Sequence, residues 1–195
     1  NLSIAKLENK LKIAKRKNKL PKLIITVHLG GLPTDPIRLN KLSKKYKFKI
    51  IEDASHSIGG KYYSKKVGCS KWSDITIFSF HPVKIITTGE GGCCTTNQKK
   101  LYEKMQMFRN NGITKDPKKF KFHNLGPWYY EQQALGFNFR MNEMQAALGL
   151  SQIKKINIYI KKRNNIANLY KKKLTDLPIK FQKIDKSFYS SYHLF

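Results

Sequence analysis

Apolar residues recur in two different patterns over the first part of the chain. In residues 3–18 they stand three or four positions apart, the spacing that places them along one face of a helix. Residues 23–29 and 48–52 are short apolar runs with few polar interruptions. Such runs are typical of strands that a parallel sheet buries on both faces. The pattern therefore predicts a helix followed by two buried strands.

A second helix is expected between these two strands. Thr34 or Asp35 can cap its first turn, and Pro36 suits the first helical position, where an N–H group is not needed. A strand, a helix and a strand in this order predict two parallel strands joined by a right-handed crossover.

A third strand is predicted at residues 75–78, which are β-branched or aromatic. Pro82 has no N–H to donate to a sheet, so the strand should end by His81. Lys84 follows at once, in a segment that turns through the glycines of residues 89–92. Ligands bind at the ends of strands in open α/β sheets, which makes Lys84 a candidate site residue.

Other patterns predict short elements around this core. Residues 59–68 indicate a hairpin centred on Ser64 and Lys65, and residues 93–96 a short strand. Asn97 is expected to cap the helix that follows.

Two longer stretches complete the chain. Residues 114–133 are polar and aromatic and predict a loop that folds over a substrate. Trp128 in this loop either stacks on a uracil or sugar ring or is buried against a neighbouring subunit. Residues 143–174 have a helical pattern with a break or bend near Asn157.

Lys84 has the surroundings of a reactive lysine. A lysine amine has an ordinary pKa of about 10.4, so it becomes a nucleophile only through desolvation or a covalent partner. Its neighbours in the sequence are apolar: Phe78, Phe80, Val83, Ile85 and Ile86. This suits a lysine that forms a Schiff base. On Lys84 alone, however, a surface lysine that lies over apolar neighbours is the better interpretation, and only the motifs around it favour the Schiff base.

Asp53 ends the second predicted strand. A carboxylate beside a pyridine nitrogen keeps that nitrogen protonated, because an opposite charge favours the charged form. A lysine with an aspartate partner is a recognisable pairing at sites of pyridoxal 5′-phosphate (PLP), so Asp53 gains this interpretation only together with Lys84. Alternatively, Asp53 caps the turn at residues 54–55.

Three motifs occur together in one order. The segments S-F-H-P-V-K (79–84) and T-T-G-E-G-G (87–92) resemble the internal-aldimine segment of the DegT/DnrJ/StrS family of PLP-dependent sugar aminotransferases. Residues 50–59, I-I-E-D-A-S-H-S-I-G, resemble its cofactor-aspartate segment, and residues 135–153 its dimer-contact segment. The similarity runs from about Leu20 to the end of the chain. It implies an α/β, aspartate-aminotransferase-like structure (fold type I), with a mostly parallel central sheet flanked by helices.

The resemblance also implies a domain division. Residues 1–150 would form part of a PLP-binding large domain, residues 151–177 linking helices, and residues 178–195 the start of a small C-terminal domain. Family members are longer at both ends and the chain does not begin with Met, so we interpret it as an internal fragment. It would lack the N-terminal third and most of the C-terminal domain, and we do not expect it to be a competent enzyme alone.

The same resemblance assigns cofactor roles to five residues. Lys84 would hold PLP as an aldimine and later act as general base, and Asp53 would protonate the pyridine ring. Ser79 would bind the cofactor phosphate. His56 stands where the family has Gln or His near the cofactor, and a loop histidine bonded to backbone is an equal alternative. Asn138 would reach the phosphate in a neighbouring subunit, so that a homodimer shares its sites.

Arg140 and Trp128 are assigned to the substrate. Asn138 and Arg140 are two positions apart, so an extended segment would place both on one face. The alternative for this pair is a satisfied polar pair on an ordinary loop.

The function implied is transfer of an amino group from glutamate to a nucleotide-linked 4-keto-6-deoxy sugar. The most similar subgroup is the transaminases of pseudaminic acid biosynthesis. Sugar dehydratases of the same family are the near alternative, although they carry His where this chain has Lys84. A non-catalytic, basic nucleic-acid-binding protein is the alternative from another class.

The formal net charge of +27 bears on that last alternative. The basic residues are nearly all lysines spread along the chain, without interleaved aromatics, so nucleic acid is not expected as a partner. No apolar run could span a bilayer and residues 1–19 lack the apolar part of a signal peptide, so we expect a cytoplasmic protein without a membrane partner. The three cysteines lack ligand spacing and predict no metal site.

Overall fold

The computed structural model describes residues 1–122 and 126–195. These residues form two compact units. The larger contains residues 1–97 and 143–195, and the smaller contains residues 98–142.

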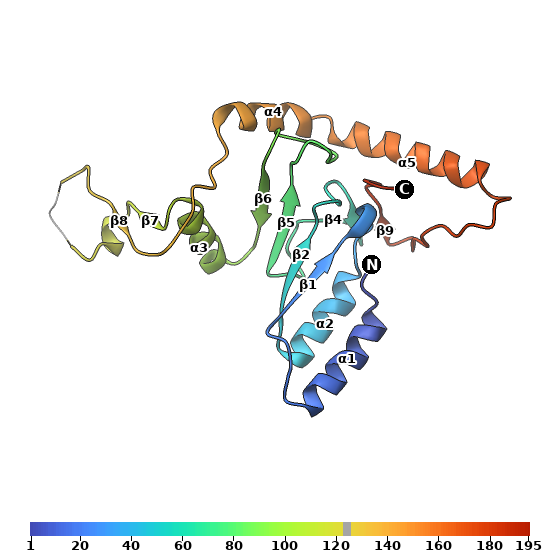
Figure 1. Cartoon of the computed structure of the whole chain (residues 1–195), viewed down its shortest axis with the longest axis horizontal. Helices are drawn as coiled ribbons and strands as arrows, with labels where there is room; N and C mark the ends of the chain where they lie inside the picture. The colour runs from blue at the N-terminus through green and yellow to red at the C-terminus, as the bar shows by residue number, and fades with distance from the viewer. Residues whose placement is uncertain (123–125) are drawn as a thin grey trace. The chain divides into compact units, whose positions relative to one another are not determined.

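A four-stranded sheet organises the larger unit (Figure 1). Its strands are β1 (Leu23–Val27), β2 (Lys49–Asp53), β5 (Ile75–Ser79) and β6 (Gly92–Thr95), in that spatial order. β1, β2 and β5 are parallel, and β6 runs antiparallel to β5. The predicted parallel strand–helix–strand unit is confirmed, with every strand end within two residues of its expected position.

Two helices cover one face of this sheet (Figure 1). α1 (Ile4–Arg16) is capped by the side chain of Ser3, and α2 (Pro36–Tyr46) by that of Asp35. Apolar residues of both helices, of β2 and of the position just before β2 form one buried cluster: Leu11, Leu39, Leu42, Tyr46, Phe48 and Ile50. Burial of one such side chain contributes about 1.5–3 kcal/mol, so this cluster holds the helices on the sheet.

The other face of β1 is exposed. Leu23, Ile25 and Val27 are 42, 59 and 44% exposed, whereas Thr26 on the covered face is 1% exposed. The prediction that both faces of this strand are buried is therefore wrong. An apolar run shows that a strand suits burial on both faces, but the pattern does not show what would cover it.

The predicted hairpin consists of β3 (Lys61–Tyr62) and β4 (Lys65–Lys66). Its turn falls at Tyr63 and Ser64, one residue earlier than expected, and both residues have positive φ, 47° and 61°. β9 (Phe188–Tyr189) pairs antiparallel with β3 and so brings the end of the chain back to the larger unit.

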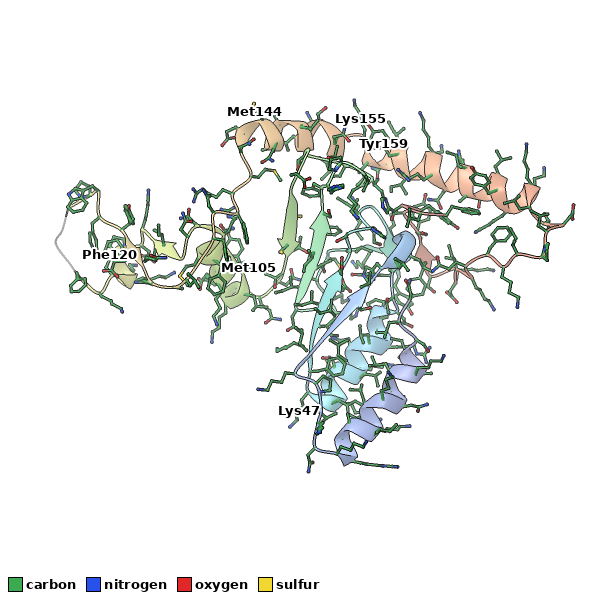
Figure 2. All side chains as sticks on the ribbon, viewed as in Figure 1. Lys47, Met105, Phe120, Met144, Lys155 and Tyr159 are labelled. Carbon is green, nitrogen blue, oxygen red and sulfur yellow. The ribbon has the colours of Figure 1, made fainter. Side chains whose placement is uncertain are left out.

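α4 (Glu143–Ile153) and α5 (Ile156–Lys173) confirm the predicted helical stretch. The break falls at Lys154 and Lys155, slightly before the bend expected near Asn157 (Figure 2). Both helices lie over the carboxyl ends of the parallel strands (Figure 1). In the part of the chain that the structure describes, no helix is long and apolar enough to cross a membrane.

The smaller unit contains α3 (Lys99–Arg109), β7 (Ile113–Thr114), the 3₁₀ turn η2 (Pro117–Lys119) and β8 (Glu131–Gln132). Asn97 does not cap α3, contrary to the prediction. Its amide donates instead to the carbonyl oxygens of Cys69 and Ser70, at 2.9 and 3.1 Å. The N-cap position of α3 falls one residue later, at Gln98, and the bonds of Asn97 tie its side chain to residues 69–70.

Glu131 organises the loop predicted at residues 114–133, of which residues 123–125 lie outside the described residues. Its carboxylate is buried. Four groups donate hydrogen bonds to it: the N–H groups of Lys121 and Phe122, the hydroxyl of Tyr129 and the amide of Gln133. Burial alone would raise the pKa of Glu131, but these donors outweigh it and hold the pKa at about 2.

Candidate active site

Three parallel strands end at one edge of the sheet. Their register pairs Val27 with Asp53 and Asp53 with Ile77, so Ser79 lies two residues further along β5 at the same edge. Paired residues of neighbouring strands point to the same face. The side chains of Asp53 and Ser79 therefore lie on the face that β1 leaves exposed. This carboxyl edge is where open α/β sheets bind ligands.

Asp53 is half-buried at the end of β2. Its Oδ1 accepts the N–H of Ser55 at 3.1 Å, so the turn expected as the alternative interpretation is present. No described residue donates to Oδ2. One oxygen thus fixes the side chain, and the other remains available to a cation or a protonated ring.

Ser79 also makes a local bond. Its Oγ accepts the N–H of His81 at 3.3 Å. A hydroxyl that accepts one bond can still donate another, so Ser79 keeps a donor for an anion.

Lys84 lies in a loop that two backbone hydrogen bonds close at its base. The N–H of Phe80 donates to the carbonyl of Gly91 at 2.8 Å, and the carbonyl of Phe80 accepts the N–H of Thr88 at 3.0 Å. Lys84 is half-buried, and its N–H donates to the carbonyl of His81 at 2.9 Å. The closed loop holds Lys84 at the strand end instead of letting it extend into solvent.

Two isoleucines anchor this loop. Ile85 and Ile86 are 6 and 2% exposed and pack with Ile160 of α5. The apolar surroundings predicted for Lys84 are therefore present on the inner side of the loop. Val83, on the outer side, is 64% exposed.

His56 shares the electrostatic environment of Lys84 and Asp53. Its Nδ1 accepts the N–H of Gly30, at 3.3 Å, from the 3₁₀ turn η1 (Leu29–Gly31) that follows β1. Burial lowers the pKa of His56, the charge of Lys84 lowers it further, and Asp53 opposes both effects. The structure thus brings together Lys84, Asp53 and His56, which the sequence had singled out separately.

Arg163 and His193 join this cluster, although no sequence motif pointed to them. The ring of His193 lies on that of His56, with 4.3 Å between ring centroids. Arg163 donates to the carbonyl oxygens of Tyr192 and His193, at 3.1 and 3.3 Å. Burial lowers the pKa of His193 to about 4, and His56, Lys84 and Arg163 add to this effect. Both residues are remote in sequence from the lysine segment, so only the folded chain reveals them.

Asn138 and Arg140 belong to the smaller unit and are exposed. Their segment is extended, as predicted: Asn138 forms an antiparallel bridge with Asn110, and the rings of Phe137 and Phe139 stack 4.9 Å apart. The alternation leaves Asn138 and Arg140 on the opposite face. Arg140 donates to the side-chain oxygen of Asn110.

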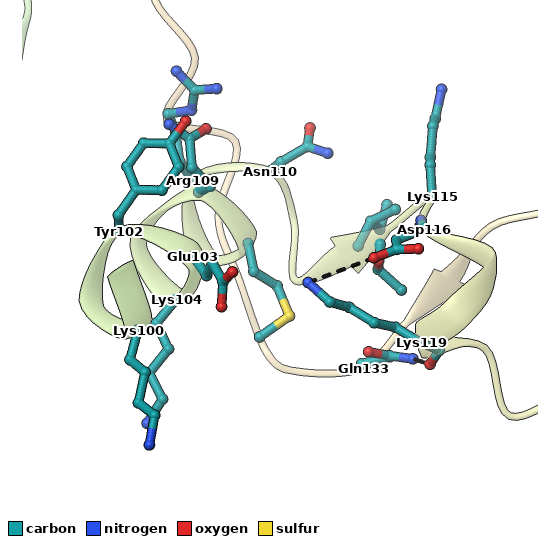
Figure 3. A pocket seen from close by; sticks show the side chains of 14 residues that line it. Lys100, Tyr102, Glu103, Lys104, Arg109, Asn110, Lys115, Asp116, Lys119 and Gln133 are labelled. Carbon is teal, nitrogen blue, oxygen red and sulfur yellow. Dashed lines mark hydrogen bonds and ion pairs between the residues drawn. The ribbon is translucent and has the colours of Figure 1, made fainter. Parts of the chain in front are cut away.

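The smaller unit also contains a hollow of about 680 Å³ (Figure 3). Charges of both signs line it, and Lys119 lies 3.8 Å from Asp116 across an ion pair. No residue that the sequence assigned to a site lines this hollow, and Trp128 is 74% exposed. Basic residues outnumber acidic ones in the lining, which contains Lys100, Lys104, Arg109, Lys115 and Lys119 with Glu103 and Asp116. Within the described ranges, no three His, Cys, Asp or Glu residues gather closely enough to hold a metal ion.

Comparison with known proteins identifies the family of the chain. The model of the DegT/DnrJ/EryC1/StrS aminotransferase family matches residues 1–195. The chain belongs to this family.

Relatives and solved structures support the same assignment. UDP-4-amino-4,6-dideoxy-N-acetyl-beta-L-altrosamine transaminase of Helicobacter pylori is 38% identical over 170 residues, which are 87% of this chain and 42% of the relative. PseC of Helicobacter pylori, an aminotransferase involved in the biosynthesis of pseudoaminic acid, superposes with a TM-score of 0.78 at 34% identity, over 94% of this chain and 47% of that one. A putative sugar aminotransferase of Streptococcus pneumoniae in its PMP form superposes with a TM-score of 0.78 at 28% identity, over 89% of this chain and 48% of that one.

Two facts follow from these matches. The fold is that of the aspartate-aminotransferase-like, fold type I transferases, as expected from the motifs. The chain spans less than half the length of the relatives that it matches.

The anchoring of the lysine loop can be tested by substitution. Ile86→Ala should lower the free energy of unfolding by about 2–5 kcal/mol, because it leaves a cavity where a 2% exposed side chain packs. Val83→Ala on the same loop is the control, and should change it by less than about 0.5 kcal/mol. Urea unfolding of both variants measures the difference, and equal losses would contradict the packing described.

Proposed function

We propose that the intact protein is a PLP-dependent aminotransferase that moves an amino group from glutamate to a nucleotide-linked 4-keto-6-deoxy sugar. One observation carries the proposal: Lys84, on an anchored loop, shares the carboxyl edge of the sheet with the carboxylate of Asp53 and the ring of His56. Membership of an aminotransferase family supports it.

The residues at this edge fit PLP. The open oxygen of Asp53 suits a protonated pyridine nitrogen, and the remaining donor of Ser79 suits a phosphate oxygen. When bound, PLP supplies an electron sink for the carbon that carries the amino group. A solved relative described as a PMP form supports the same cofactor.

Lys84 would have two tasks. Its amine would hold the cofactor covalently between reactions, and after an incoming amine displaces it, the free amine would carry the proton as a general base. Ile85 and Ile86 keep water from the inner side of its loop.

The substrate class is inferred from the relatives and from charge. One relative is named for a UDP-linked 4-amino-4,6-dideoxy sugar, and a solved one is described as acting in pseudoaminic acid biosynthesis. A nucleotide sugar is anionic, and the net charge of +27 attracts anions. Arg140 and Trp128 are exposed, and we assign them to contacts with the sugar nucleotide.

The test is turnover by the purified intact protein. With PLP, glutamate and a UDP-linked 4-keto-6-deoxy-N-acetylhexosamine, we expect 2-oxoglutarate and the amino sugar in equal amounts, since each transfer consumes one glutamate. Loss of the sugar's hydroxyl without net transfer of an amino group would indicate a dehydratase and contradict the proposal. Strongly salt-dependent DNA binding without turnover would indicate the basic binding protein instead.

Asp53→Asn should leave the protein folded but lower turnover by about 10²-fold or more, because a neutral amide cannot hold a pyridinium proton. The amide oxygen can still accept the N–H of Ser55. Asp35→Asn, at the N-cap of α2, is the matched control and should retain turnover. If Asp53 serves only the turn, the substitution should leave both stability and turnover nearly unchanged, because Asn and Asp are equally good caps.

We further propose that two subunits share their active sites. The segment of Asn138 and Arg140 presents exposed polar donors, and a phosphate dianion needs such donors. In a twofold dimer, each subunit would lend its Asn138 to the Lys84 site of its partner.

Subunit mixing tests this sharing. Lys84→Ala and Asn138→Ala subunits should each be nearly inactive alone. The heterodimer would have one site with both lesions and one with neither, so mixing should restore part of the activity. No recovery after demonstrated subunit exchange would mean that Asn138 serves its own chain's site or none.

A further inference from the structure

Hydrogen bonds from two other segments hold His56, one at its ring and one at its backbone carbonyl. The N–H of Gly30 donates to Nδ1 at 3.3 Å, and the hydroxyl of Ser191 donates to the carbonyl oxygen of His56 at 2.8 Å. A ring nitrogen that accepts a hydrogen bond carries no proton, so neutral His56 has its proton on Nε2.

The ring of His193 covers that of His56. Their centroids are 4.3 Å apart and their planes meet at 41°. Nδ1 of His193 is buried and has no hydrogen-bond partner among the described residues. An unbonded buried nitrogen costs free energy, so Nδ1 does not stabilise the ring in this position. The ring is instead stabilised there by its packing on the ring of His56.

The segment that carries His193 is tied to the same turn as His56. The N–H of Ser191 donates to the carbonyl of Gly31 at 3.0 Å, and the N–H of Leu194 donates to the carbonyl of Gly30 at 3.3 Å. Gly31 has a φ of 103°, and a Cβ there would lie 2.8 Å from the backbone of the segment. Glycine is therefore required for so close an approach. The turn η1 therefore positions the rings of both His56 and His193 through its hydrogen bonds.

Charged groups around the pair favour neutral rings. The groups that face it are Lys84, Arg163 and Asp53. Burial and the two cations lower the pKa of His193 to about 4, with His56 contributing as well. Burial and then Lys84 lower the pKa of His56, against the opposing effect of Asp53. A second proton on His56 would also turn Nδ1 into a donor and break the bond that it accepts.

We propose that His193 is a positioning residue for His56: it shields that ring from water and holds it in one orientation, with its proton on Nε2, beside Lys84. The proposal rests on the proposed function, in which His56 is a residue of the cofactor site. It adds a residue from the far end of the chain, which acts through His56 and not on the substrate.

Nitrogen NMR of the intact, cofactor-free protein labelled at histidine reports the tautomer and the pKa of His56, whose signal is identified with His56→Gln. We expect the Nε2–H tautomer in the unchanged protein. His193→Ala opens the ring to water, so the pKa of His56 should rise toward the ordinary value and the tautomers should mix. His193→Phe keeps an aromatic ring in place and should preserve both properties.

Phe195→Ala is the matched control, because Phe195 is on the same segment, is 57% exposed and stacks on Tyr170 instead of His56. It should leave the His56 signal unchanged. An unchanged signal in His193→Ala, or a changed one in His193→Phe, would overturn the proposal. The measurement needs no PLP, so its outcome does not depend on the proposed function. The proposed function is contradicted by a different result, namely that the protein does not use the cofactor.

Discussion

Parallel pairing of β1, β2 and β5 is the constraint on which the rest of the structure depends. Its register aligns Val27, Asp53 and Ile77, so the residues that follow each of the three strands lie at one edge of the sheet. The turn η1, the Asp53 carboxylate and the Lys84 loop all begin at that edge. An aspartate and a lysine that are distant in sequence meet there because the strands that carry them are neighbours.

The two faces of the sheet have different tasks. On the covered face, Glu52 is 2% exposed and accepts the hydroxyl of Thr76 at 2.8 Å, a buried bond that ties β2 to β5. Asp53 and Ser79 point to the other face, which β1 leaves apolar and exposed. Buried bonds and helix packing on one side thus hold the strand ends still, while the opposite side offers a surface for the cofactor and substrate that we propose.

The fold and half of the site could be predicted from local signals. Apolar runs, Asp35 before Pro36, and Pro82 after a β-branched run marked strands and a helix, because these signals act within a few residues. Asp53 stood out because it ends a strand, and Lys84 because it lies in the loop that follows one. His193 could not be found in this way, because its role depends on a contact with His56 from the far end of the chain. Asn97 was assigned wrongly because the cap position falls at Gln98, and its own side chain donates to carbonyl groups that are distant in sequence.

The most direct test of the central claim is the site at which the cofactor attaches. Borohydride reduction of the intact protein with PLP makes the carbon–nitrogen bond between them permanent, and peptide mapping then locates the bond. Our account predicts one labelled peptide, the one that contains Lys84, and no label there in Lys84→Arg. Label on a different lysine, or label spread over many of the chain's lysines, would contradict it.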